Sequence, residues 1–560
     1  AVQIRPPQPI YEIFTMIKIF YILSIYISIL GYSAIVTKIF FKNYNENVNS
    51  FDLVFGLILL YFLSFLINFF FPLKYFSTYI FGVGLILFLF FFKYAYKNID
   101  FYLIFIIVSL TIIIEPNSLA ADTNFYHLQI IKWYSNERAV FGIANLESRL
   151  GLISGWHHLL SMFNIVINKV NFLYILNTIP LIIISHQVFT NKSKNYLKLN
   201  EIYLNSVLIF LLIFAIIHPT LNGTIFNTMG SADADSAGTY FFIGSFYFFL
   251  KFIDEKKEKD FLYLITLVNL SYIAKISNIF LILLPLYLII FNNIDLKKMK
   301  NFIIFLFILN IFWLSKIVIS TGCLIFPLEF TCFNFDWSVP KHIVNSFILE
   351  ASAFPRSKNN VDVHYHNLEY YIYSYKWFHT WFMNYFINIS FIQICFLLII
   401  ISLLLIIRKI SFDIFLFNKK ILVFLFIFFL IKINYWLIAP DIRYAYGIFI
   451  SVTLLFFSYA VNNNTKYIDR FIKYKNIIFM SLFIILVIKN IKYQFSDNFF
   501  NENRTFDYTN ISFYKKINNF ELYKTSSGNC AFFEKICINS DKESLIIERN
   551  HNYLFIKNEK

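Results

Sequence analysis

Charged residues are scarce in this chain of 560 residues, where Asp, Glu, Lys and Arg together make up 14%. Soluble globular domains carry about a quarter charged residues, so the composition excludes an ordinary soluble protein. Hydrophobic residues instead make up 58% of the chain. Uncharged windows of about 20 residues, the length of a transmembrane helix, recur along most of it. The sequence therefore predicts a polytopic membrane protein.

Glycine and cysteine are also scarce, with 14 and 5 residues. The sequence has no Gly-rich phosphate loop, no CxxC metal site and no nucleophile elbow, which argues against the enzyme classes that use them. Lys and Arg exceed Asp and Glu, 48 against 33. No platform of aromatic and basic residues lies outside the hydrophobic segments, so we expect no nucleic-acid partner. The first segment, "AVQIRPPQPIYEIF", shows no signal-peptide cleavage site.

The hydrophobic segments predict fourteen membrane spans. They lie at 13–37, 51–71, 75–92, 99–114, 171–190, 204–221, 236–253, 261–274, 277–292, 301–320, 387–407, 421–438, 444–460 and 476–490. With the N-terminus outside, the connections rich in Lys and Arg all fall on the cytoplasmic face, as the positive-inside rule requires. This topology requires that residues 151–170 do not cross the membrane. Trp156 and two adjacent His residues there suit an interfacial or re-entrant helix.

The polar segments then collect on the opposite, outer face. They are 115–170, 222–235, the turn at Lys275, 321–386, 439–444 and the tail 491–560. Cysteines occur in two of these segments as close pairs, Cys323 with Cys332 and Cys530 with Cys537. Because an outer compartment is oxidising, each pair is a disulfide candidate, although spacing alone does not decide whether the bond forms.

Asp122 opens a helical pattern in the first large outer segment. An acid is favoured at a helix start by the free backbone N–H groups and the helix dipole. Phe125, Leu128 and Ile131 share one face, so residues 122–134 are predicted to lie flat on the outer membrane surface with this apolar stripe toward lipid. Asp122 is then either a helix cap or a general base that takes a proton from an acceptor hydroxyl.

Other acids and bases on the outer face also have two interpretations. Asp233 and Asp235 either cap the next helix or face the cavity that contains Asp122, with Asp235 favoured as the cap and Asp233 for the cavity. Their spacing also permits one divalent cation. Lys275 either snorkels to the interface or meets a phosphate. Arg443 either pairs with Asp441 or binds a phosphate through its planar guanidinium.

Aromatic and His residues near Asp122 complete the set of candidates. We expect Tyr126 or His127 to line the cavity. His157 and His158 are candidates for contact with donor or acceptor, but adjacent residues on a helix point in different directions, so they do not share one metal ion.

The segment "ADTNFYHLQIIKWY" and the later "SGWHHLL" resemble the first outer loop of the GT-C superfamily of integral-membrane glycosyltransferases. The similarity is greater to a bacterial group of GT-C-like membrane proteins with a "DTxxYHxxxIxW" stretch before a "GLANLxxRxG" stretch. "STGCLIFPLEFTCFNFDWSVP", "APDIRYAYG" and the paired cysteines of the tail are also similar to that group. Two features depart from the superfamily: Thr123 follows Asp122 where many members have a second acid, and four predicted spans precede the loop.

The resemblance implies a polyprenyl-phosphate-sugar donor and inversion at the sugar, with Asp122 as the catalytic base. The identities of the sugar and the acceptor do not carry over from the resemblance, and we expect the acceptor to be an envelope glycan or lipid. The resemblance also implies an all-α polytopic fold with three parts: N-terminal spans in 1–114, a catalytic module in 115–490 and an outer tail in 491–560. It places the protein in a bacterial inner membrane, with the active face toward the periplasm; a divalent cation is the one cofactor considered. The alternatives are a transporter or flippase of a lipid-linked glycan, and a glycan polymerase or ligase of another fold.

Overall fold

The computed structural model describes most of the chain, and the following account covers only those residues. They are 8–41, 49–114, 122–164, 176–191, 198–218, 229–292, 294–357, 368–375, 377–383, 390–408, 419–462, 465–494, 510–526, 530, 533, 535–538 and 544–558. Parts of several predicted outer segments, among them 115–121, 222–228 and 495–509, lie outside the described residues.

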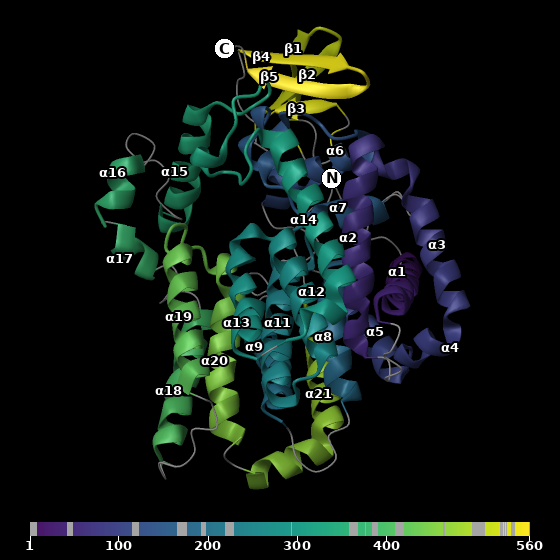
Figure 1. Ribbon diagram of the computed structural model, residues 1–560, viewed down its shortest axis with the longest axis vertical. Helices are drawn as coiled ribbons and strands as arrows, with labels where there is room; N and C mark the ends of the chain where they lie inside the picture. Colours follow the sequence, from purple (N-terminus) through teal and green to yellow (C-terminus); the bar gives the residue numbers. More distant parts are fainter. Residues whose placement is uncertain are drawn as a thin grey trace.

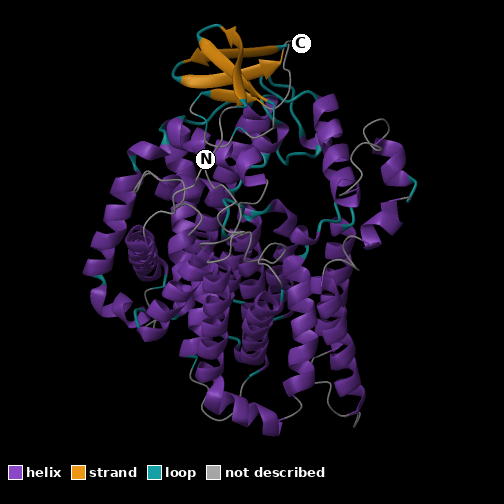
Figure 2. Cartoon of the chain, turned by 180° about the vertical axis from the view of Figure 1, so that it is seen from behind, coloured by secondary structure: helices purple, strands orange, loops and turns teal. Residues whose placement is uncertain are grey.

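The described residues form a bundle of helices with a small group of strands at one end (Figures 1 and 2). The helices before residue 200 are α1 (Gln8–Phe40), α2 (Leu53–Phe70), α3 (Ser77–Phe90), α4 (Phe92–Ala95), α5 (Phe101–Ile114), α6 (Leu128–Asn136), α7 (Gly155–Asn164), α8 (Ile179–Thr190) and α9 (Leu199–Ile217). Those that follow are α11 (Asp235–Glu255), α12 (Glu258–Ala274), α13 (Leu283–Phe291), α14 (Lys300–Thr321), α15 (Lys341–Ser357), α16 (Leu368–Tyr373), α17 (Trp377–Trp381), α18 (Ser390–Arg408), α19 (Lys419–Trp436), α20 (Tyr446–Asn462) and α21 (Thr465–Gln494).

Six stretches of the described chain are helical, long enough and apolar enough to cross a membrane. They are Met16–Phe40, Ser50–Phe70, Leu199–Ile217, Asp235–Glu255, Leu296–Thr321 and Phe471–Lys492. Shorter apolar helices accompany them, and each of the fourteen predicted segments overlaps a helix. These lengths and compositions are those of an α-helical membrane protein. The number of spans remains a prediction.

The bundle has a buried centre and an apolar outer surface. α11 and α12 lie at the centre, and nearly all their side chains are buried. α14 and α21 instead expose large apolar side chains, such as Phe307 at 66% and Ile477 at 64%. Because exposed apolar surface of this extent is unfavourable in water, these faces fit contact with lipid.

Ion pairs gather several helix ends at what we call the basic end of the bundle. Lys259 near the start of α12 pairs with Asp52 before α2 at 3.6 Å, and Lys298 before α14 pairs with Glu258 at 2.8 Å. Lys198 before α9 pairs with Glu255 at the end of α11 at 2.7 Å. The segments that the positive-inside rule assigns to one face therefore lie together in the fold.

The prediction of an all-α chain is wrong for the C-terminal tail. The tail contains β1 (Ile511–Ile517), β2 (Phe520–Thr525), β3 (Ile536–Ile538), β4 (Leu545–Asn550) and β5 (Tyr553–Asn558). β1 and β2 form an antiparallel pair, with β3 parallel to β2, and β4 and β5 form a separate hairpin. These strands sit at the end of the bundle that we call the sheet end (Figures 1 and 2).

Hydrogen bonds attach the tail to the loop that follows α6. Phe141 forms two backbone hydrogen bonds with β5, both at 2.9 Å. Its N–H donates to Leu554 O, and its carbonyl oxygen accepts the Ile556 N–H. Gly142 comes next and has a φ of +70°, and a Cβ there would lie 2.2 Å from the Ile556 carbonyl oxygen. Only glycine adopts this conformation without a clash, so the local sequence fits the docked tail.

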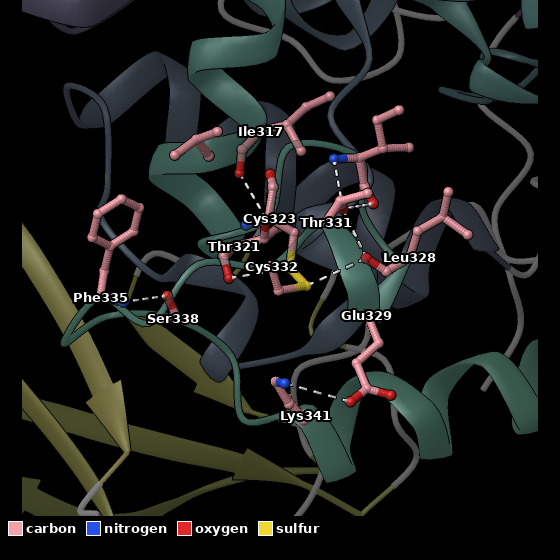
Figure 3. The surroundings of a disulfide bond; sticks show 12 residues. Ile317, Thr321, Cys323, Leu328, Glu329, Thr331, Cys332, Phe335, Ser338 and Lys341 are labelled. Carbon is pink, nitrogen blue, oxygen red and sulfur yellow. Dashed lines mark hydrogen bonds and ion pairs between the residues drawn. A yellow bond between two sulfur atoms is a disulfide. The ribbon is translucent and has the colours of Figure 1, made fainter.

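Both cysteine pairs of the outer segments are disulfide-bonded in the structure, Cys323 with Cys332 and Cys530 with Cys537. Figure 3 shows the first bond, which closes the loop after α14. Thr321 stabilises this loop because its hydroxyl accepts the Cys323 N–H at 3.0 Å and donates to Ile317 O at 2.7 Å. Cys395 is buried in α18 without a disulfide.

Candidate functional site

The side chains of Asp122 and Arg443 meet near the sheet end of the bundle. Arg443 Nη1 donates to Asp122 Oδ2 at 2.7 Å, and the two residues are 321 positions apart in the sequence. The Asp122 side chain is 35% exposed and that of Arg443 26%. Asp122 makes no side-chain capping hydrogen bond to the π-helical turn that follows it, Thr123–His127. The interpretation of Asp122 as a helix cap is therefore wrong, and its carboxylate faces a cation instead.

Arg443 is held by the turn "APDIRY" between α19 and α20. Asp441 accepts the Arg443 backbone N–H at 2.9 Å, and its Oδ2 accepts side-chain N–H groups of Arg443 at 3.3 and 3.2 Å. Trp436 Nε1–H donates to Asp441 O at 2.7 Å and fixes the turn from α19. Arg443 thus contacts two carboxylates, one of them the predicted partner Asp441, while phosphate binding stays a prediction. Asp441 raises the pKa of Arg443 well above its usual range.

The pKa of Asp122 reflects two opposing effects. Burial raises it, but the charge of Arg443 and its hydrogen bond, together with the charge of Arg149, more than offset burial, so the pKa falls below the ordinary 3.8. At neutral pH the residue is a carboxylate, which is the form that can accept a proton.

Asp233 and Asp235 exchange the roles predicted for them. Asp233 Oδ1 accepts the Asp235 backbone N–H at 2.9 Å, so Asp233 caps the start of α11. Asp235 instead forms an ion pair with Lys275, at the end of α12. The prediction failed because an Asp can accept a backbone N–H two residues ahead as readily as it caps from the adjoining position. Asp233 keeps its other oxygen, Oδ2, buried without a hydrogen bond, and burial raises its pKa.

Lys275 does not snorkel toward lipid. Its ammonium lies on Asp235 and 4.3 Å from the centroid of the Tyr444 ring, next to Arg443 in the sequence. The Arg443 guanidinium lies 6.0 Å from the centroid of the same ring, so both ion pairs, Lys275 with Asp235 and Arg443 with Asp122, lie beside Tyr444. The charges of Asp122, Asp233 and Asp235 all act on Tyr126, which places Tyr126 beside the same group of residues.

The His residues separate as predicted for neighbours on one helix. His157 Nε2–H donates to Ala232 O at 3.1 Å, and its ring lies 4.9 Å from that of His127. Burial lowers the pKa of His127 to about 4, so it is neutral at pH 7. His158 is not part of the group, because its ring stacks on Tyr134 at 3.7 Å on the other side of α7.

The prediction that residues 122–134 expose one polar face and press one apolar stripe into lipid is wrong. Within α6 every residue from Leu128 to Ser135 is buried. The tail covers the polar side: Gln129 Nε2 donates to Cys530 O at 3.1 Å, and Lys132 Nζ donates to Lys535 O at 2.7 Å. The prediction failed because the polar residues of α6, which suggested contact with water, donate instead to backbone carbonyls of the tail, about 400 residues later in the sequence. At about 14 Å, α6 is too short to span a bilayer.

Arg149 connects the site to the long outer segment. It forms ion pairs with Glu147 at 3.2 Å and with Glu350 of α15 at 2.6 Å, and its guanidinium lies 4.8 Å from the centroid of the Phe125 ring. Arg356, in the last turn of α15, donates to Ile438 O at 2.8 Å, just before the turn that holds Arg443. α15 is thus attached both to Arg149 and to the segment that leads into the Arg443 turn.

Sequence reasoning missed two residues that position the site. The Tyr444 ring contacts the cations of both ion pairs, and its only signal in the sequence is its place beside Arg443. Asn177 donates to Ser231 O at 2.5 Å and to Asp233 O at 2.9 Å, which fixes the loop before α11. A buried Asn within an apolar segment is a signal that could have been noticed, since such a residue needs hydrogen-bond partners. Among the described residues, no three His, Cys, Asp or Glu side chains are grouped to hold a metal ion.

The fold and site define an α-helical protein of membrane type with a cluster of paired acids and bases near one end of its bundle. The chain belongs to a family whose model matches residues 13–450 and is described as a domain of unknown function, DUF8201. The match includes every candidate site residue from Asp122 to Arg443 and ends before the strands of the tail. Searches of the curated proteins and of the solved structures returned no match.

Proposed function

We propose that the protein is a membrane glycosyltransferase of the GT-C type, which moves a sugar from a polyprenyl-phosphate donor to an envelope glycan or lipid. The observation that carries the proposal is the contact between Asp122 and Arg443. This contact joins a carboxylate of the first outer loop that caps no helix to a cation of a turn 321 positions later. Lys275 and Asp235 lie beside the contact. A base and phosphate-binding cations are the groups that this transfer requires.

In the proposed reaction an acceptor hydroxyl attacks the anomeric carbon of the sugar. The new C–O bond forms as the bond from that carbon to the phosphate oxygen breaks, and the hydroxyl proton passes to Asp122. The polyprenyl phosphate leaves with the electron pair of the broken bond, and Arg443 stabilises the charge that develops on it through two parallel N–H groups. Direct displacement inverts the configuration at the sugar. Tyr126, His127 and His157 line the proposed cavity as neutral groups.

The ion pairs suggest an order of events. Arg443 lowers the pKa of Asp122, and a carboxylate with a low pKa is a weak general base. A donor phosphate would compete with Asp122 for the guanidinium, which would raise the pKa of Asp122 and make it a better base. The donor therefore binds before proton transfer, and the base becomes effective only in the loaded site.

The proposed location is a bacterial inner membrane with the site toward the periplasm. Its support is that the site, both disulfides and the tail lie at the end of the bundle opposite the Lys-rich connections.

The test uses a deletion strain of the native host and the lipid-linked sugars of its membranes. We expect one polyprenyl-phosphate sugar to accumulate, and the wild-type gene to remove it. Asp122→Asn keeps the size of the side chain but loses the base, so transfer from that lipid by purified protein should fall about 10²–10⁴-fold. Asp295→Asn is the matched control, because Asp295 is an exposed acid that caps a turn at the basic end.

Near wild-type transfer by folded Asp122→Asn protein would contradict the proposed mechanism. If a lipid-linked glycan accumulates on one face of the membrane and remains chemically unchanged by the purified protein, the transporter or flippase becomes the better hypothesis.

A further inference from the structure

A small cavity lies at the C-terminal end of α6, and its lining does not include Asp122. Its walls come from the end of α2, from α6 and the loop after it, and from the last turns of α14. The polar groups that line it belong to Asn68, Tyr134, Arg138, Lys316 and Ser320. The candidate site uses none of these residues.

Lys316 is the central feature of this cavity. The residue is 2% exposed although it lies in an apolar helix, where an ammonium group is costly without compensation. Its Nζ donates to Asn68 Oδ1 at 2.7 Å and to Asn68 O at 3.2 Å. A lysine ammonium has three N–H donors. The two Asn68 oxygens accept two of them, and the ammonium also lies 4.7 Å from the centroid of the Phe69 ring. Within the described part of the chain no third oxygen accepts from it.

The charge around the cavity is positive. Among the described residues no carboxylate pairs with Lys316, and no Asp or Glu lines the cavity. Arg138 lines it as a second cation, with its guanidinium 5.8 Å from the centroid of the Phe71 ring. The neighbouring Glu137 is paired with Arg549 of β4 at 2.8 Å. Two basic side chains therefore line the cavity, and the acid next to Arg138 in the sequence is already paired.

The cavity also contains unused hydroxyl groups and has a defined size. The Tyr134 hydroxyl is buried and makes no hydrogen bond within the described part of the chain, and Ser320 adds a second hydroxyl. The space accommodates about one water molecule. It is too small for a phosphate or a lipid headgroup, so among anions only a monatomic ion comes close to its size.

We propose that this cavity is a binding site for a single halide ion, chloride in the cell. Lys316 supplies the charge and its third N–H, Arg138 contributes positive potential, and the Tyr134 and Ser320 hydroxyls donate. The bound ion would compensate the buried ammonium. It would also connect α14 to Asn68 and to the loop after α6, because Asn68 Nδ2 donates to Tyr134 O at 3.1 Å and to Glu137 O at 3.0 Å.

The test measures the thermal unfolding midpoint of the purified full-length protein while sodium bromide replaces sodium gluconate at constant ionic strength. Wild-type protein should show a saturable rise in the midpoint. Lys316→Met removes the charge and keeps the apolar stem, and it should abolish the rise. Lys432→Met is the matched control, since Lys432 is also buried and donates to a backbone carbonyl, Ser277 O, but does not line the cavity; it should retain the rise.

Two milder variants keep the proposal testable if Lys316→Met does not fold. Tyr134→Phe and Ser320→Ala should each raise the half-saturating bromide concentration about tenfold, the effect of losing one hydrogen bond to a charged group. Anomalous scattering from crystals grown in bromide should place one ion beside Lys316 Nζ. An unchanged midpoint in wild-type protein, or an equal rise in Lys316→Met protein, would show that the cavity holds only water and overturn the proposal.

Discussion

At the scale of single residues, Arg443 decides the chemistry available to Asp122. It is shared between Asp441, which fixes its position, and Asp122, whose pKa it lowers. A guanidinium that one acid fixes in position can exchange its second acid for another anion without moving. This arrangement is stronger support for a phosphate-binding role than the presence of Arg443 in the sequence.

Substitution of Arg443 should therefore change both rate and pH dependence. In Arg443→Ala protein the effect of burial on Asp122 is opposed less, so its pKa rises and the acid limb of the profile of kcat/KM against pH moves to higher pH. The rate should fall about 10²–10³-fold. Arg443→Lys should shift the limb less and lose less activity, because Lys keeps a charge but not the planar fork. An acid limb that stays in place in Arg443→Ala protein would show that Arg443 does not control Asp122.

The low pKa of His127 predicts that the folded protein loses stability in mild acid. Its pKa is about 4 in the folded protein, against an ordinary value of about 6.5 for the unfolded chain. As pH falls below about 6.5 the unfolded chain takes up a proton that the folded chain cannot accept until about pH 4, so stability decreases across this window, by roughly 3 kcal/mol. The thermal midpoint measured against pH should fall less steeply for His127→Gln protein. Exposed His342 provides the control, and His342→Gln should leave the slope unchanged.

The sequence located these residues better than it assigned their roles. Asp122, Lys275 and Arg443 stood out because a charge beside an apolar run needs an explanation. Their partners could not be read from the sequence, since each ion pair joins segments that only the fold brings together. Asp233 and Asp235 are a different case, because they lie two residues apart at a helix start and the sequence does not show which one accepts the backbone N–H and which one meets Lys275.

At the scale of elements, the composition predicted the helices but did not predict the strands of the tail. Long uncharged runs leave little choice of structure in lipid, because every backbone group must be satisfied internally. The strands had a weaker signal that was present nonetheless. β4 and β5 are rich in β-branched and aromatic residues and flank His551 and Asn552, both at positive φ, as a two-residue hairpin turn requires.

The burial of α6 shows what local pattern cannot reveal. Its polar residues are those of a surface helix, but the tail supplies their partners from the far end of the chain. A helix of this pattern lies equally well on a membrane or beneath another domain, and the choice depends on contacts of very long range.

Gly142 should be essential for docking of the tail. Gly142→Ala places a methyl group on the Ile556 carbonyl oxygen at a positive φ, so we expect a loss of more than about 1 kcal/mol and faster proteolysis of the tail in folded protein. Gly82→Ala is the matched control. A Cβ at Gly82 in α3 meets no atom within 4 Å, and alanine favours a helix, so this variant should be at least as stable as wild type. Equal protease resistance in both variants would show that the tail does not depend on this close approach.

At the scale of the whole molecule, the fold has two chemically different ends. The basic end carries surface ion pairs between helix ends, such as Lys298 with Glu258, and these contribute little to stability individually. The sheet end carries the disulfides, the tail and the paired charges of the candidate site. The positive-inside rule anticipated this division from Lys and Arg alone, because it depends on local charge and not on tertiary contacts.

The orientation of these two ends in the membrane is the remaining prediction, and it decides which compartment the candidate site faces. We expect the basic end in the cytoplasm and the tail outside. In intact cells a membrane-impermeant maleimide should label Ser512→Cys, on an exposed position of β1, and should label Lys257→Cys, exposed after α11, only after permeabilisation. The native Cys530 and Cys537 should stay unlabelled without reductant because they are bonded to each other. The opposite labelling pattern would place Asp122 and Arg443 toward the cytoplasm, where a disulfide is not maintained, and the donor would then have to approach from the inner leaflet.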